Sequence, residues 1–87
     1  MNLGWCELTS QDAAKIIEGL HKLESLDLDG NDFSGDVKEL ADAFNGKKIK
    51  KLSLNDCNLT SKNAAKIIKS LPDEIENLYL IYEVSAW

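Results

Sequence analysis

The chain is 87 residues long, with 44% hydrophobic and 29% charged residues, a composition typical of one globular domain and not of a disordered chain. Its net charge of -5 disfavours non-specific attraction to nucleic acid or to an anionic membrane surface, because both are negatively charged. No apolar run approaches the roughly 20 residues of a membrane span, and the N-terminus lacks the segments of a signal peptide. We therefore expect a cytoplasmic protein that binds neither nucleic acid nor membrane.

The charge is distributed unevenly along the sequence. Residues 1–43 hold three Lys and ten acidic residues, a net charge of -7, whereas residues 44–87 hold seven Lys and five acidic residues, a net charge of +2. All ten basic residues are Lys. Without Arg the chain lacks the planar fork that grips phosphate or carboxylate in a bidentate way, so phosphate recognition is not expected.

An internal repeat is the strongest feature of the sequence. Residues 3–20, LGWCELTSQDAAKIIEGL, align with residues 54–71, LNDCNLTSKNAAKIIKSL, and eleven of the eighteen positions are identical. A diverged copy lies between them, which gives a period of 25 to 26 residues, and a partial copy follows. A fixed period of this length predicts stacked units, each buried against its neighbours. We expect one domain, 1–87, built from units 1–22, 23–48, 49–74 and a partial unit 75–87.

Each unit changes from strand-like to helix-like patterning. Leu26 and Leu28 alternate with Asp27 and Asp29, which is the period-two pattern of a half-buried strand. The second part of each unit has helical spacing, and Thr9 and Thr60 are well placed to cap the first and third helices. The apolar stripes expected to pack on the sheet are Ala13, Ile16, Ile17 and Leu20; Val37, Leu40, Ala41 and Phe44; and Ala64, Ile67, Ile68 and Leu71.

The segments LESLDLDGNDF and IKKLSLNDCNL resemble the leucine-rich-repeat family, most closely its ribonuclease-inhibitor-like and cysteine-containing subfamilies. The resemblance covers nearly the whole chain. It implies an α/β fold, a leucine-rich-repeat solenoid of about 3.5 repeats, with a parallel β-sheet on the concave face and helices on the convex face. It also implies that Cys6, Asn31 and Cys57, which fill one column of the repeat, turn inward as a structural ladder that bonds loop backbone.

The two cysteines are not spaced for a disulfide. They lie two units apart, so strands spaced ~4.8 Å apart would separate their Cα atoms by ~10 Å. A disulfide requires a Cα separation of about 4.4 to 6.8 Å. We therefore expect Cys6 and Cys57 to be reduced and inaccessible in the folded chain.

No constellation of residues indicates catalysis. The single histidine, His21, has no Cys, His or carboxylate at ligand spacing, and neither a Gly-rich phosphate loop nor a nucleophile elbow is present. The run Lys47, Lys48, Lys50 and Lys51 has no interleaved aromatic residue to stack on bases and fits a solvated surface. The sequence predicts no enzymatic activity, no cofactor, no metal and no nucleic-acid partner.

The family resemblance implies that the concave strand face binds a protein partner. Register alone nominates the residues between the buried leucines, and Trp5 lies in the loop beside them. Trp5 either anchors the partner or covers the open first unit, and both interpretations stand. Charge reversal at Asp27 and Asp29 is expected to weaken the complex and leave the melting temperature nearly unchanged. The predicted partner-binding residues are Trp5, Asp27, Asp29, Lys51, Ser53, Asn55, Tyr79 and Ile81.

The C-terminal segment, NLYLIYEVSAW, is apolar on both faces of an extended strand and has a free edge. It predicts a two-fold homodimer formed through Tyr79, Ile81, Tyr82 and Trp87; alternatively, the last residues fold back and cap the chain. Met1 stands in the column of the buried leucines, so the chain begins within a strand. A second hypothesis is therefore a structural fragment or designed repeat scaffold that folds and self-associates through its C-terminal edge.

Overall fold

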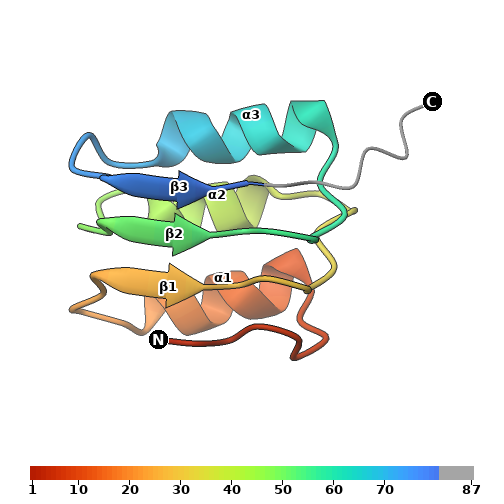
Figure 1. Cartoon of the computed structure of the whole chain (residues 1–87), viewed down its shortest axis with the longest axis horizontal. Coiled ribbons are helices and arrows are strands. Elements are labelled where there is room, and N and C mark those ends of the chain that lie inside the picture. Colours follow the sequence, from red (N-terminus) through yellow and green to blue (C-terminus); the bar gives the residue numbers. More distant parts are fainter. Residues whose placement is uncertain (81–87) are drawn as a thin grey trace.

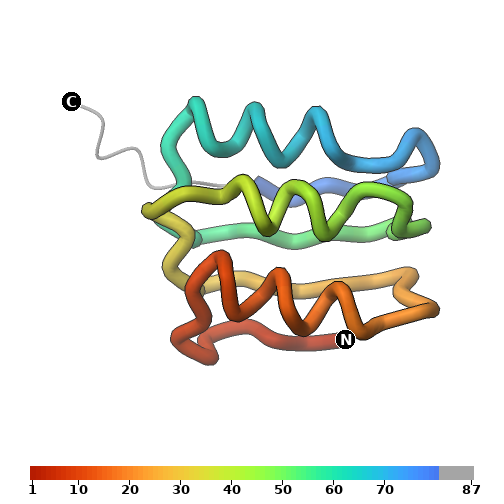
Figure 2. The backbone as a smooth tube through the Cα atoms, turned by 180° about the vertical axis from the view of Figure 1, so that it is seen from behind, coloured from red at the N-terminus to blue at the C-terminus, as the bar shows by residue number. Residues whose placement is uncertain are grey.

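The computed structural model describes residues 1–80, in which strands and helices alternate (Figure 1). The helices are α1 (Ser10–Glu18), α2 (Lys38–Phe44) and α3 (Ser61–Ser70). The strands are β1 (Ser25–Asp27), β2 (Lys51–Ser53) and β3 (Asn77–Tyr79), which form a parallel sheet in the order β1-β2-β3. All three helices lie side by side on one face of the sheet, as Figure 2 shows from behind. The predicted α/β fold with a parallel sheet is confirmed.

The strands keep the register of the sequence repeat. Leu26 pairs with Leu52, and Leu52 pairs with Leu78, so each step across the sheet equals 26 residues. Residues 1–5 continue the sheet beyond β1, although they form only an isolated bridge there. The N–H of Leu3 donates to the carbonyl of Asp27 over 2.8 Å, and the N–H of Trp5 donates to that of Asp29 over 2.8 Å. The first unit therefore stacks on the second through backbone hydrogen bonds.

The core lies between the sheet and the helices. In β1 and β2 the central leucine is buried and its neighbours are not, so alternation directs one side chain of each strand towards the helices. Phe33 and Phe44 are the largest fully buried side chains, and they fill the middle unit. Both belong to the unit that has neighbours on two sides, which is where a stack of units buries most apolar surface.

Two of the helices begin with side-chain caps at the threonines predicted from the sequence. Thr9 Oγ1 accepts from the N–H of Asp12 (3.2 Å), and Asp12 Oδ2 accepts from the N–H of Thr9 (3.3 Å), which is a complete capping box. Thr60 Oγ1 accepts from the N–H of Asn63 (3.1 Å). These bonds satisfy N–H groups that the first helical turn leaves without a partner.

The prediction that Ile68 packs into the core is wrong. Both α1 and α3 contain the sequence AAKII, yet Ile17 of α1 is 0% exposed and the equivalent Ile68 of α3 is 45% exposed. The difference follows from position in the stack. Helix α2 lies between α1 and α3 and covers Ile17 of α1. Within residues 1–80 no helix packs on the corresponding side of α3.

Candidate binding surface

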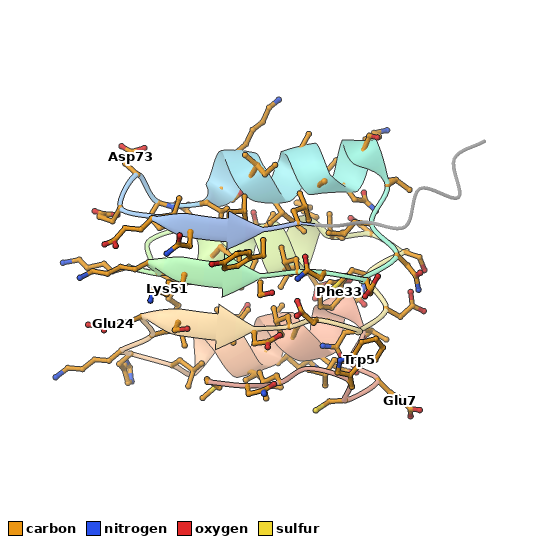
Figure 3. The ribbon with its side chains drawn as sticks, in the orientation of Figure 1. Trp5, Glu7, Glu24, Phe33, Lys51 and Asp73 are labelled. Atoms are coloured by element: carbon orange, nitrogen blue, oxygen red, sulfur yellow. The ribbon has the colours of Figure 1, made fainter. Side chains whose placement is uncertain are left out.

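The sheet face opposite the helices, called here the strand face, consists of outward side chains from the three strands. Lys51 and Tyr79 are exposed on it, Tyr79 by 54%, and Asp27 and Ser53 are half-buried. In Figure 3, Lys51 lies at the start of β2, and Trp5 lies at the opposite end of this face. The structure thus brings together most of the residues nominated by register. Whether they contact a partner remains a prediction.

A hydrogen-bond network ties the acidic part of the strand face together. Asp29 Oδ1 accepts from Ser53 Oγ over 2.6 Å and from the N–H of Asn55 over 2.7 Å. Asp27 Oδ1 accepts from the N–H of Asp29 over 2.9 Å. Asp29 therefore stabilises the turn that follows β2 as well as facing outward. For Asp29 these bonds now predict a lowered melting temperature on charge reversal, because the reversal removes two hydrogen bonds from the fold.

Trp5 stands exposed at the end of the first strand segment. Its side chain is 72% exposed, and its backbone has φ +56°, a left-handed conformation that costs most L-residues about 1–2 kcal/mol. One face of the indole ring rests on Gly30, where an added Cβ would lie 2.2 Å from a ring carbon. The ring thus covers Gly30 and still presents most of its surface to solvent. Gly30 and Asp56, which occupy the same column of the next two units, also have positive φ, so this conformation belongs to the turn of each unit.

A depression of about 550 Å³ opens beside Trp5 on the edge formed by the loops that follow the strands. We call this edge the loop edge; it comprises residues 4–9, 29–37 and 55–60, which contain five carboxylates and no Lys. Ser34, through its hydroxyl and its N–H, lowers the pKa of the exposed Asp32 carboxyl. Negative charge next to an exposed indole suits a cationic side chain. The residues lining the depression are Trp5, Glu7, Thr9, Gly30, Asn31, Asp32, Asp56 and Asn58.

Sequence reasoning found Trp5 and missed the carboxylates around it. Glu7, Asp32 and Asp56 were not nominated, because they lie beyond the alternating strand pattern. The repeat itself contained the necessary signal. Glu7, Asp32 and Asn58 occupy one column of successive units, and stacked units place the members of a column side by side. Reading columns through the loops, as well as through the strands, would have predicted an acidic edge.

The side chain of Asn31 makes four hydrogen bonds to backbone groups of the loops. Its Nδ2 donates to the carbonyls of Leu3 and Leu28, both over 2.9 Å. Its Oδ1 accepts from the N–H groups of Cys6 (3.2 Å) and Leu8 (3.0 Å). Asn31 is 2% exposed, so these four bonds satisfy backbone groups that have little access to water. The loop of the first unit, which carries Trp5, is thereby fixed to the second.

Cys57 makes the equivalent contact one unit later, and Cys6 does not. Cys57 Sγ donates to the carbonyl of Leu28 over 3.0 Å and is buried. Cys6 stands in the first unit of the described residues, and its Sγ donates to the carbonyl of Gly4 over 3.4 Å instead of to a preceding unit. Cys6 is exposed, so the prediction that both thiols are inaccessible is wrong for Cys6. Of the three predicted ladder residues, Asn31 and Cys57 therefore donate to a carbonyl of the preceding unit, and Cys6 does not.

The two thiols should differ sharply in reactivity. Burial raises the pKa of Cys57 from its ordinary value of 9.0 to about 11. A thiol reagent at pH 8 is expected to label Cys6 rapidly and Cys57 at least 100-fold more slowly, since the reactive thiolate is both rare and shielded at Cys57. Mass spectrometry of the labelled peptides separates the two sites. Equal labelling rates under native conditions would show that the ladder position of Cys57 is incorrect.

The same shift predicts a pH dependence of stability. The unfolded chain loses the Cys57 proton above pH 9, whereas the folded chain keeps it until about pH 11. The contribution of the protonated thiol is therefore fully present below pH 9 and is lost as the pH rises from 9 to 11. The melting temperature of the wild type should fall more steeply across this interval than that of Cys57→Ala. Parallel pH profiles for the two chains would contradict the assignment.

Gly30 and Gly46 provide a matched test of the Trp5 contact. Both have positive φ, +73° and +82°, but a Cβ on Gly46 would meet nothing within 4 Å. Gly46→Ala should cost about 1 kcal/mol from backbone strain alone. Gly30→Ala should cost more, because the methyl group must displace the indole. With Trp87→Phe as background, the fluorescence of Trp5 should change in Gly30→Ala and not in Gly46→Ala; equal costs and unchanged emission would refute the contact.

Three nominated residues, Ile81, Tyr82 and Trp87, lie outside the described residues. Within residues 1–80, no group of three or more His, Cys, Asp or Glu side chains is arranged to hold a metal ion. The helices in this part of the chain are all too short or too polar to cross a membrane.

Comparison with known families gives one match. The family model described as Leucine Rich Repeat matches residues 22–43. This stretch contains β1, the loop with Asn31 and nearly all of α2, which is one strand, loop and helix of the stack. The match supports a leucine-rich-repeat family. Searches of curated proteins and of solved structures gave no match.

Proposed function

We propose that this chain is a non-catalytic protein-binding module, a leucine-rich-repeat solenoid of about 3.5 repeats of the ribonuclease-inhibitor-like type that acts in the cytoplasm. Leucine-rich-repeat domains generally mediate protein–protein interaction. The observation that carries the proposal is the exposed indole of Trp5, which lies beside the strand face. Aromatic side chains of this kind supply much of the binding energy at protein interfaces.

The charge of the surface indicates the chemistry of the partner. Five carboxylates, with Asp29 among them, and no Lys occur in the loop-edge segments, and Asp27 adds a sixth on the adjacent part of the strand face. We propose a partner that lays a segment rich in Lys or Arg across this surface, with one cation over Trp5. A cation on an indole face contributes about 0.5–2 kcal/mol. Nucleic acid and anionic membrane are disfavoured as partners because they would be repelled.

Affinity capture with matched variants tests this proposal. The immobilised wild type, Trp5→Ala and Lys66→Ala are compared, since Lys66 is exposed on α3, away from the strand face. A genuine partner should be recovered on the wild type and on Lys66→Ala and at least 10-fold less on Trp5→Ala. Its capture should also weaken with added salt. Recovery that is equal on all three chains would rule out the strand face and loop edge as the binding surface.

Self-association through the C-terminal edge is a second candidate. The observation in its favour is Tyr79, 54% exposed on β3, whose outer edge pairs with no strand within residues 1–80. Unpaired backbone groups on such an edge can bind another chain. A two-fold dimer would use Tyr79 together with Ile81, Tyr82 and Trp87. Sedimentation of the intact chain and of a chain ending at Glu83 tests this candidate, since a monomer in both would exclude it.

A further inference from the structure

The outer side of α3 repeats the surface with which α1 packs on α2. In α1, Ser10, Ala14 and Ile17 are buried, and Ser10 Oγ donates to the carbonyl of Asp36 over 2.7 Å. The equivalent residues of α3 are Ser61, Ala65 and Ile68, which have the same identities and are all exposed. A surface that forms a helix-packing interface once in this chain is thus present a second time without a covering helix in residues 1–80.

The outer side of α1 repeats, in turn, the surface with which α3 packs on α2. In α3, Ile67 is buried and Asn63 Nδ2 donates to the carbonyl of Gly35 over 2.9 Å. The equivalent of Ile67 in α1 is Ile16, which is half-buried; the equivalent of Asn63 is Asp12, an exposed carboxylate that accepts hydrogen bonds and cannot reproduce the donation by Asn63. The two ends of the stack therefore present the two apolar sides of one stacking interface.

Charge distinguishes the two ends. Helix α1 carries Lys15 against Asp12 and Glu18, a net charge of -1, whereas α3 carries three Lys and no acid, a net charge of +3. Contact between two α3 helices would oppose lysine to lysine. Contact between α3 of one chain and α1 of another would bring opposite charges together, which favours association.

The sheet allows the same arrangement. The outer edge of β3 and the outer edge of residues 1–5 are the two free edges of a parallel sheet within residues 1–80, and they lie at opposite ends of the stack (Figure 1). Stacking one chain on the next in the same direction would let these edges pair in parallel, as β1 pairs with β2. The contact would continue the interface that already joins the units of this chain.

We propose that copies of this chain associate head to tail, with the α3 surface formed by Ser61, Ala65 and Ile68 docking on α1 of the next copy. The two surfaces in contact differ, so the association is open-ended and forms chains longer than a dimer. The strand face of each copy stays accessible, and this proposal therefore stands or falls separately from partner binding there.

Sedimentation velocity of the intact chain over a range from 5 to roughly 500 μM, at low and high salt, tests the proposal first. The expected result is a mean mass that rises past the dimer with concentration and falls with added salt. Either a monomer throughout or a mass that stops at the dimer would overturn head-to-tail association, and the second result would support the two-fold dimer.

Two blocked variants test the direction of the contact. Ile68→Lys places a charge on the α3 surface, and Ile16→Lys places one on the α1 surface. Each variant alone should be monomeric or at least 10-fold weaker in association, because each lacks one of the two surfaces. An equimolar mixture should form a discrete heterodimer, since each chain retains the surface that the other lacks. A two-fold dimer through α3 predicts instead that Ile16→Lys associates normally and that the mixture forms no heterodimer.

Controls separate association from folding. Glu39→Ala changes an exposed side chain of the middle helix α2 and leaves both outer helix surfaces intact, so its association should equal that of the wild type; loss of association in this variant would overturn the proposal. Circular dichroism checks that each variant is folded. If Ile68→Lys does not fold, the exposed pair Lys62→Glu and Lys69→Glu replaces it, with loss of association expected from repulsion by the acidic α1. Unchanged association in that variant would overturn the proposal.

Discussion

Replacing Asn31 by Leu is expected to lower the free energy of unfolding by roughly 3–5 kcal/mol, because it removes the partner of four backbone groups in one buried and three partly buried hydrogen bonds. The carbonyls of Leu3 and Leu28 and the N–H groups of Cys6 and Leu8 would all lose the amide. A chain of this size has a total stability of roughly 4–13 kcal/mol. Urea denaturation should therefore show a greatly lowered midpoint or an unfolded chain.

Asn31→Cys is the matched variant for this position. Cys57 shows that a thiol in this column can donate to the carbonyl of the preceding unit. Asn31→Cys should keep the donation to Leu3 and lose both the donation to Leu28 and the acceptor for the two N–H groups, so its stability should fall between those of the wild type and Asn31→Leu. A Leu variant as stable as the wild type would mean that the ladder does not stabilise the stack.

Reversing the charge at Asp29 is expected to destabilise the fold by roughly 2–4 kcal/mol, because hydrogen bonds to a charged group contribute more than neutral ones. Asp29→Lys removes the acceptor of Ser53 Oγ and of the N–H of Asn55 and leaves an ammonium in its place. The melting temperature should fall by roughly 10 °C or more. Calorimetry of the purified variant measures the change.

Asp56→Lys is the control for this reversal. Asp56 is exposed in the neighbouring loop and has φ +57°, so its reversal changes the surface charge equally and should cost about 1 kcal/mol or less, from backbone strain that Lys tolerates less well than Asp. Asp56→Lys can therefore be used to test the acidic loop edge in binding, whereas Asp29→Lys cannot. Equal melting temperatures for Asp29→Lys and the wild type would show that Asp29 is free for binding, as register alone suggested.

Local patterns predicted most of the fold because each unit repeats the same strand and helix pattern. The spacing of Leu26, Leu52 and Leu78 determined the strand register, and Thr9 and Thr60 determined where two helices begin. These features depend on residues close in sequence or separated by one period. A single sequence is sufficient to recognise both.

The errors arose where a residue's surroundings depend on its place in the stack. Cys6 and Cys57 share a column, as Ile17 and Ile68 share a helical position, but in each pair one residue is buried by a neighbouring unit and the other is exposed at an end. Periodicity treats all copies as equal and cannot distinguish an end from a middle. The structural bonds of Asp29 were missed for a related reason, since outward register does not reveal which outward side chains bond to one another.

The central claim is that a partner binds the strand face and the loop edge. The most direct measurement is hydrogen–deuterium exchange of the chain with and without a partner recovered by affinity capture. We expect slowed exchange in residues 2–8, 27–32 and 53–58 and around Tyr79, with unchanged exchange in α1, α2 and α3. Protection confined to the helices, with the strand face and loop edge unaffected, would contradict it.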